Sequence, residues 1–138
     1  MRIYTIGYSN RKFEDFIELL HRLGIKLVVD VRSFPRSKWP EFEGESLKNS
    51  LPSCGIKYVH LRELGGYRRG GYKAYMRTDE FERGLRKLMK LARKNRTVIM
   101  CLESYPSGCH RRFIAGKLKE LGWEVIHIVG KKDKQQTL

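Results

Sequence analysis

Two short, almost continuously apolar segments constrain the fold most: residues 28–31 (VVDV) and 98–101 (VIMC). A strand with one solvated face alternates apolar and polar residues, so these runs are typical of strands covered on both faces in a mostly parallel sheet. Short segments rich in Val, Ile and Tyr and bounded by Gly or polar residues predict five strands, at residues 2–6, 26–32, 56–61, 97–103 and 124–129.

Helical patterns lie between most of these strands. Apolar residues recur at helical spacing over residues 13–23, which end at Gly24, over 81–92 and over 113–121, which end at Gly122. Thr78 is a predicted N-cap, and a short helix is expected around residues 46–51. This alternation predicts an α/β fold: a three-layer sandwich with a mostly parallel sheet of about five strands and helices on both faces. We expect one α/β domain over residues 1–130 and a polar, frayed tail over 131–138.

The charge of the chain points to an anionic partner. The 138 residues include 29 Lys and Arg against 15 Asp and Glu, a formal net charge of +14. Such an excess favours nucleic acid, either DNA or RNA, or another phosphate-bearing anion. The alternative is the heavily charged surface of a heat-adapted, thermostable protein, which explains many charges but not their single sign.

The sequence also excludes several classes of protein. No apolar run reaches the roughly 20 residues of a membrane helix, and the chain starts directly with a strand-like segment rather than a signal peptide, so we expect a cytoplasmic protein without a membrane partner. Three cysteines argue against a secreted disulfide framework, and Cys54 is interpreted as a small apolar filler. The Cys and His spacing matches no common zinc pattern, so neither a metal nor another cofactor is predicted.

Most of the suggestive chemistry lies in segments that follow predicted strands. In open α/β sheets ligands bind beyond the carboxyl ends of the strands, so the loops at 7–11, 32–40, 62–75 and 103–112 should meet at one edge. Cys101 ends a predicted strand and Cys109 precedes a helix beside Arg111 and Arg112, where a helix N-terminus and basic neighbours should lower the pKa of the thiol. The catalytic candidates are therefore Cys109, Cys101, Glu103 and Asp30.

Several of the same loops supply candidates for binding an anion. Asp30 and Arg32 alternate on one strand, so they should pair, and Asp30 would orient the guanidinium toward a phosphate or carboxylate. Neighbouring helical residues point about 100° apart, so His110 is not expected to act as the base for Cys109. Glu103 could act as acid or base, or hold Arg111 or Arg112 in place. The anion-binding candidates are Ser9, Asn10, Arg32, Ser33, His110, Arg111 and Arg112; Ser9 and Asn10 could instead cap a helix.

Residues 62–78 form a long segment without a period of its own. It interleaves arginines and tyrosines, a composition that could stack on bases and neutralise phosphates, and its predicted nucleic-acid contacts are Arg68, Arg69, Tyr72 and Lys73. The alternative is a mobile loop whose arginines are merely solvated.

Five blocks of sequence together resemble the domain of unknown function 488 family: TIGYSN at 5–10, VDVRSFPRS at 29–37, HLRELGG at 60–66, MCLE at 100–103 and CHR at 109–111. The resemblance spans residues 3–128 and implies the fold rather than an activity. Tyr8 departs from the family pattern, in which histidine is common. A looser similarity, to rhodanese-like domains, implies that Cys101 stands where those proteins carry a persulfide.

Two hypotheses of function follow. The leading one is a nucleic-acid-binding, and by extension nucleic-acid-processing, protein with an anion-accepting cleft at the carboxyl edge of the sheet. The alternative is a thiol-dependent enzyme of sulfur-transfer or phosphatase type that uses Cys109 or Cys101. The sequence leaves open whether any reaction is catalysed.

Overall fold

Five parallel strands form the centre of the molecule, as the apolar runs predict. The computed structural model describes residues 1–103, 105, 109–129 and 135–137. The strands are β1 (Arg2–Gly7), β2 (Leu27–Asp30), β3 (Lys57–His60), β4 (Thr97–Cys101) and β5 (Glu124–Ile128). Their order in the sheet is β3-β2-β4-β1-β5, extended by β6, so β4 occupies a fully paired central position.

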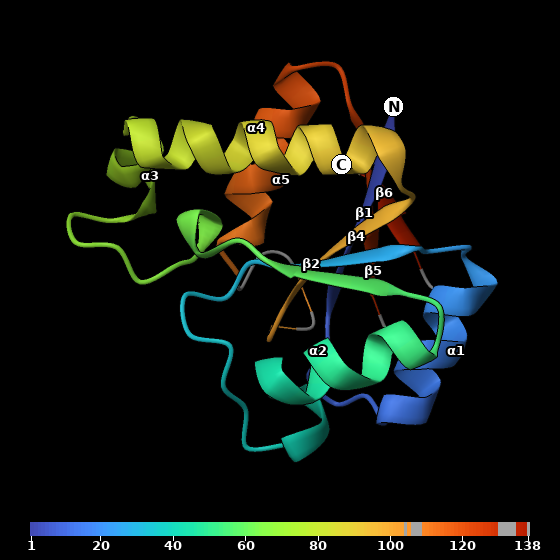
Figure 1. The fold of residues 1–138 in the computed structure, drawn as a ribbon. Coiled ribbons are helices and arrows are strands. Elements are labelled where there is room, and N and C mark those ends of the chain that lie inside the picture. The colour runs from blue at the N-terminus through green and yellow to red at the C-terminus, as the bar shows by residue number, and fades with distance from the viewer. Residues whose placement is uncertain (104, 106–108, 130–134, 138) are drawn as a thin grey trace.

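Helices cover both faces of this sheet and complete the three predicted layers. Figure 1 shows α1 (Phe13–Arg22) and α2 (Gly44–Ser53) on one side, with α4 (Asp79–Lys94) and α5 (Arg111–Glu120) on the other. Shorter helical turns are η1 (Pro40–Phe42), η2 (Arg62–Leu64) and α3 (Tyr72–Tyr75). Each face of the sheet therefore has its own apolar core.

The strand register aligns the exits of four strands at one edge. Gly7 of β1 is opposite Cys101 of β4, while Asp30 of β2 is opposite Met100 on one side and His60 on the other. Because the strands are parallel, every loop that leaves them starts from this edge. The edge is therefore where the candidate residues can meet.

Helix starts agree with the sequence at one position and differ at another. Thr78 caps α4 as predicted, its hydroxyl accepting a hydrogen bond from the Phe81 amide at 3.2 Å. The capping role considered for Ser9 and Asn10 is wrong, because α1 begins at Phe13 and its N-cap is Lys12. Asn10 instead lies in a left-handed turn, with φ of 63°.

The end of the chain differs from the frayed tail that its polarity predicts. Gln135–Thr137 form β6, which pairs antiparallel with β5, Gln135 being opposite Ile128. Backbone pairing on an open sheet edge does not depend on apolar side chains, so composition does not reveal it. Residues 130–134 and 138 lie outside the described residues. Within the described part, no helix is long and apolar enough to cross a membrane.

Candidate functional site

A cavity of about 330 Å³ opens at the carboxyl edge of the sheet. It is walled by the segments that leave β1, β2 and β4 and by residues from 66–72. Its lining side chains carry aromatic rings, guanidinium groups, a carboxylate, an imidazole and two sulfurs. They belong to Tyr8, Arg32, Ser33, Phe34, Arg36, Tyr67, Tyr72, Cys101, Leu102, Glu103, Cys109 and His110.

Arg32, which lines the cavity, forms a buried ion pair with Asp30, as the alternation of the two residues predicts. Arg32 donates from Nε to Asp30 Oδ1 at 2.9 Å and from Nη2 to Oδ2 at 2.6 Å. Tyr58 donates a further hydrogen bond to Oδ2 at 2.6 Å. Burial lowers the pKa of Arg32, but the hydrogen bonds and charge of Asp30 outweigh it and raise that pKa above its ordinary value. Arg32 is therefore a permanently charged, oriented group.

Two histidines hold the segment that leaves β2. His60 Nε2 lies 2.6 Å from the Arg32 carbonyl, and His110 Nε2 lies 2.8 Å from the Val31 carbonyl. A carbonyl only accepts, so in each ring Nε2 carries the hydrogen. Residues far apart in the sequence thus fix one strand exit.

The surroundings of His110 favour its uncharged form. Burial lowers the pKa of His110, and the charges of Arg111 and Arg68 lower it further, although the carbonyls of Val31 and Leu64 oppose this. At pH 7 the ring is therefore neutral, with Nε2–H donating and Nδ1 carrying a lone pair. The expectation that adjacency separates His110 from Cys109 is also wrong: Nδ1 lies 3.7 Å from Cys109 Sγ. Both residues precede Arg111, where α5 begins, so the helical 100° spacing does not apply to them.

The two thiols of the site are paired. Cys101 and Cys109 are joined by a disulfide, with Cα atoms 7.6 Å apart. The sequence predicts two free thiols, because residues eight positions apart give no local sign of contact. The start of α5, however, returns over the end of β4. A lowered thiol pKa is therefore a prediction for the reduced form.

Arg111, two residues beyond Cys109 in the chain, is a second buried arginine. The Arg111 side chain is fully buried, and its backbone amide donates to Cys109 Sγ at 3.5 Å. Burial and the nearby charge of Arg11 lower the pKa of Arg111 to about 10, although Glu103 opposes this. Burial, and after it the charge of Arg111, lower the pKa of His127 to about 4.

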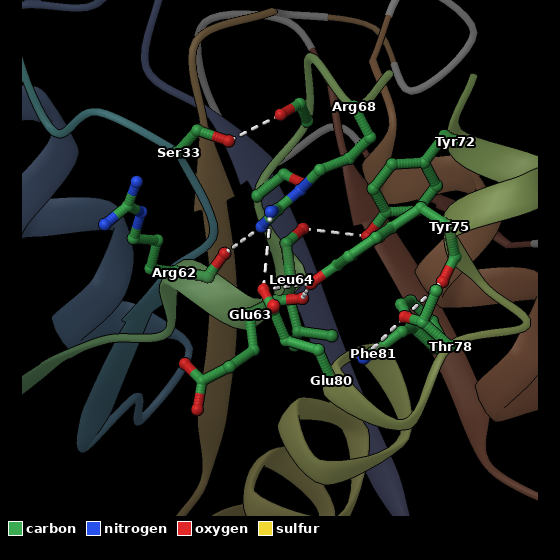
Figure 2. Close-up of polar contacts among 12 residues, drawn as sticks. Ser33, Arg62, Glu63, Leu64, Arg68, Tyr72, Tyr75, Thr78, Glu80 and Phe81 are labelled. Carbon is green, nitrogen blue, oxygen red and sulfur yellow. Dashed lines mark hydrogen bonds and ion pairs between the residues drawn. The ribbon is translucent and has the colours of Figure 1, made fainter. Parts of the chain in front are cut away.

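The segment at 62–78 is a packed structure rather than a solvated loop. Figure 2 shows the Arg68 guanidinium directed inward: it donates to the carbonyls of Arg62 and Gly65 and to Glu80 at 3.4 Å. The Arg68 guanidinium also lies 4.0 Å from the centre of the Tyr75 ring. Arg68 is thus occupied within the protein, which removes the main reason to expect it on a phosphate.

Tyrosines of the same segment have structural roles as well. The Tyr72 hydroxyl donates to the Leu64 carbonyl at 2.8 Å, and the Tyr75 hydroxyl donates to the Glu63 carbonyl and to Glu80 (Figure 2). Burial raises the pKa of Tyr72 well above its usual range. Tyr72 presents only part of its ring to the cavity, whereas Arg69 and Lys73 are exposed.

Two loops that line the cavity approach each other closely at Ser33 and Gly66. The Ser33 hydroxyl donates to the Gly66 carbonyl at 2.5 Å (Figure 2). A Cβ placed on Gly65 would lie 2.6 Å from the Ser33 Cα, so only glycine fits there. The HLRELGG block is therefore a packing requirement of the site.

Not every predicted residue reaches the cavity. Of the predicted catalytic and anion-binding residues, Ser9, Asn10, Asp30, Arg111 and Arg112 are absent from the described lining, whereas Glu103 is present. Arg112 instead lies with its guanidinium 4.7 Å from the centre of the Phe113 ring.

Several lining residues were not predicted from the sequence, and most of them have exposed side chains. Phe34 and Tyr67 are 65% and 97% exposed, and Arg36 and Leu102 are also exposed. Apolar side chains inside predicted strand-exit loops were the available signal, because loops of a soluble domain seldom present large aromatic rings. Tyr8, missed as well, is buried under Phe42 with ring centres 4.5 Å apart.

Comparison with known proteins gives one result. A family model described as "Domain of unknown function DUF488" matches residues 12–118, which is well over half of the chain. Neither a curated protein nor a solved structure matches the chain.

Proposed function

The chain belongs to the DUF488 family, whose description assigns no activity, and from the site itself we propose that it binds single-stranded nucleic acid across the cavity mouth. The observation that carries the proposal is Tyr67. Its ring is 97% exposed, and its backbone φ of 56° lies in the left-handed region. A non-glycine residue in that region costs of order 1 kcal/mol or more, so strain and exposure together indicate selection for a ligand.

Two other exposed rings, Phe34 and Trp39, have cationic neighbours, and Phe34 lines the same cavity as Tyr67. Phe34 faces the Arg62 guanidinium at 5.9 Å, and Trp39 lies 4.7 Å from the Lys38 amine. We call Phe34, Trp39 and Tyr67 the aromatic rim. Paired aromatic and basic side chains favour unpaired bases over duplex, because only an unpaired base offers both faces for stacking.

The net charge of +14 supports the same ligand. Arg36 lines the cavity, Arg62 lies near Phe34, and Arg69 and Lys73 follow Tyr67 in the chain. All four are exposed and can neutralise phosphates. Arg68 is left out of this set because its donors are used inside the protein.

The test is a fluorescence-anisotropy titration with single-stranded and duplex oligonucleotides of DNA and RNA. We expect preference for single strands, and Phe34→Ala or Tyr67→Ala should weaken binding about 5- to 100-fold, since each stacked base contributes roughly 1–3 kcal/mol. Both rings are exposed, so the variants should remain folded. Absence of binding at low salt, or unchanged affinity in the double variant, would contradict the proposal.

The salt dependence gives a second readout for the cationic groups. Replacing Arg36 or Arg69 by Ala should reduce the log–log salt slope by about 0.7 for each lost phosphate contact. Arg86→Ala, on the exposed side of α4, removes the same charge and should leave the slope unchanged. An equal effect of all three would mean that net charge, not the rim, governs binding.

A further inference from the structure

The disulfide occupies a position that a purely structural cross-link does not need. Cys101 and Cys109 both line the cavity, and their residues are 2% and 9% exposed. Cys101 ends a strand that is paired on both sides, so the main-chain hydrogen bonds already fix its position. The cross-link thus lies where small molecules that enter the cavity meet it.

Cys109 has an oriented base beside it. The Val31 carbonyl fixes the His110 tautomer with hydrogen on Nε2, which leaves the Nδ1 lone pair 3.7 Å from Cys109 Sγ. The contact can shorten once the cysteine carries a proton, since contacts of catalytic groups are often long before reaction. A nucleophile, a base and a group that orients the base are the parts of an activated thiol.

The surroundings of Cys109 also favour its thiolate. The Arg111 amide donates to Sγ at 3.5 Å, at the N-terminus of the ten-residue helix α5. The Arg111 side chain, two residues along the chain, is fully buried. Positive ends of helices and nearby arginines both stabilise a thiolate. Cys101 is the more deeply buried of the two sulfur residues.

We propose that Cys101 and Cys109 form a redox-active pair that exchanges two electrons with thiols of another molecule, and that Cys109 is the sulfur that reacts with them. In the oxidised protein a partner thiolate attacks Cys109 Sγ, which forms a mixed disulfide, breaks the Cys101–Cys109 bond and releases the Cys101 thiolate. A second partner thiolate then attacks the partner's sulfur in the mixed disulfide and releases the Cys109 thiolate.

The exchange balances in protons and electrons. Two partner thiols lose two protons and two electrons and become a disulfide, while the protein gains two thiols. His110 Nδ1 takes the proton of an attacking partner thiol and returns it to the Cys109 thiolate, while water carries the second partner proton to Cys101. In the reverse direction His110 Nδ1 takes the Cys109 proton, and the Cys109 thiolate attacks a partner disulfide and releases one partner thiolate. The Cys101 thiolate then attacks Cys109 Sγ and releases the second partner thiolate. Sulfur transfer or phosphate-ester chemistry at either cysteine would first require this reduction, because a disulfide sulfur is not a nucleophile.

The first experiment measures the exchange itself. A Cys54→Ser protein, in which only the pair remains, is equilibrated at pH 7 in buffers of reduced and oxidised dithiothreitol, quenched with acid, alkylated and weighed by mass spectrometry. We expect a reversible change between zero and two alkylated thiols in the folded protein. Two thiols at every ratio, or reduction only after unfolding, would overturn the proposal.

The second experiment tests the role of His110 in the reduced form. Iodoacetamide should modify Cys109 at pH 7 faster than a free thiol of ordinary pKa about 8.5, and His110→Gln should slow it about tenfold. His60→Gln is the matched control, since His60 makes the same kind of bond to the neighbouring Arg32 carbonyl from β3, two strands from Cys101. Equal rates in parent and His110→Gln, or equal slowing by His60→Gln, would overturn the assignment.

The result is separable from the proposed nucleic-acid binding. Phe34→Ala and Tyr67→Ala should leave the dithiothreitol titration unchanged, and Cys101→Ser should leave oligonucleotide affinity measurable. A protein that binds oligonucleotide but never forms the cross-link would refute only the redox pair.

Discussion

Two buried arginines lie at the same edge of the sheet, and their surroundings act on them in opposite directions. Arg32 has a bidentate bond to Asp30, which raises its pKa, whereas burial and a neighbouring arginine lower the pKa of Arg111 to about 10. The β2 exit therefore neutralises its own charge. At the junction of β4 and α5 the exposed Glu103 opposes the lowering of the Arg111 pKa, and the Arg111 backbone amide donates to Cys109 Sγ. The pKa values of the two arginines therefore shift in opposite directions, although both side chains are buried at one edge of the sheet.

Removing the Asp30 carboxylate that pairs with Arg32 should have the largest effect on the free energy of unfolding. Asp30→Asn leaves the Arg32 charge buried without its carboxylate and should lower the free energy of unfolding by about 3–5 kcal/mol. Urea denaturation measures this. Glu18→Gln, which breaks the exposed pair with Arg22, is the control and should cost about 0.5 kcal/mol or less. If Asp30→Asn cost as little as Glu18→Gln, the buried pair of Asp30 and Arg32 would stabilise the fold no more than an exposed pair does.

Lowering the pH, which protonates His127, should have the next largest effect on the free energy of unfolding. The folded-state pKa of His127 is about 4, below its ordinary 6.5, so the unfolded chain takes up the proton first as the pH falls. Stability is then constant above about pH 6.5 and falls by up to about 3 kcal/mol toward pH 4. The lowered pKa of His110 acts in the same direction.

Urea unfolding from pH 8 to 4 checks the window, and NMR titration follows the His127 ring. His127→Gln should remove most of the dependence, while His21→Gln on the exposed side of α1 should keep it. Arg111→Gln should raise the pKa of His127, because the Arg111 charge lowers it. An unshifted His127 in that variant would break the link between the two groups.

The smallest expected effects on stability come from the two tyrosines that contact the Asp30–Arg32 pair. Tyr58→Phe removes a 2.6 Å hydrogen bond to the Asp30 carboxylate and should cost about 1.5–3 kcal/mol. Tyr8→Phe removes only a 3.3 Å contact with Arg32 and should cost about 1 kcal/mol or less. Thermal and urea unfolding of the two variants give the order. The reverse order would show that Tyr8, not Tyr58, completes the ion pair.

Much of the framework was predictable because it depends on local periodicity. All five parallel strands were located within one or two residues at each end, since continuous apolar runs such as residues 98–101 require burial on both faces. The Thr78 cap is equally local. The pairing of Asp30 with Arg32 follows from period-two alternation on one strand. β6 was missed because its pairing is carried by the backbone.

The sequence by itself therefore determined the α/β layers, the edge where the site lies and the residues that could meet there. Only the tertiary structure decided which of them do. In the tertiary structure the Arg68 guanidinium points inward, and Cys101 is joined to Cys109. His110 contacts the Cys109 sulfur, and Phe34 and Tyr67 are exposed to solvent. Backbone and apolar patterns repeat within a few residues and can be read along the chain. The partners of a charged or polar side chain come from distant loops, and its role depends on how deeply those loops bury it.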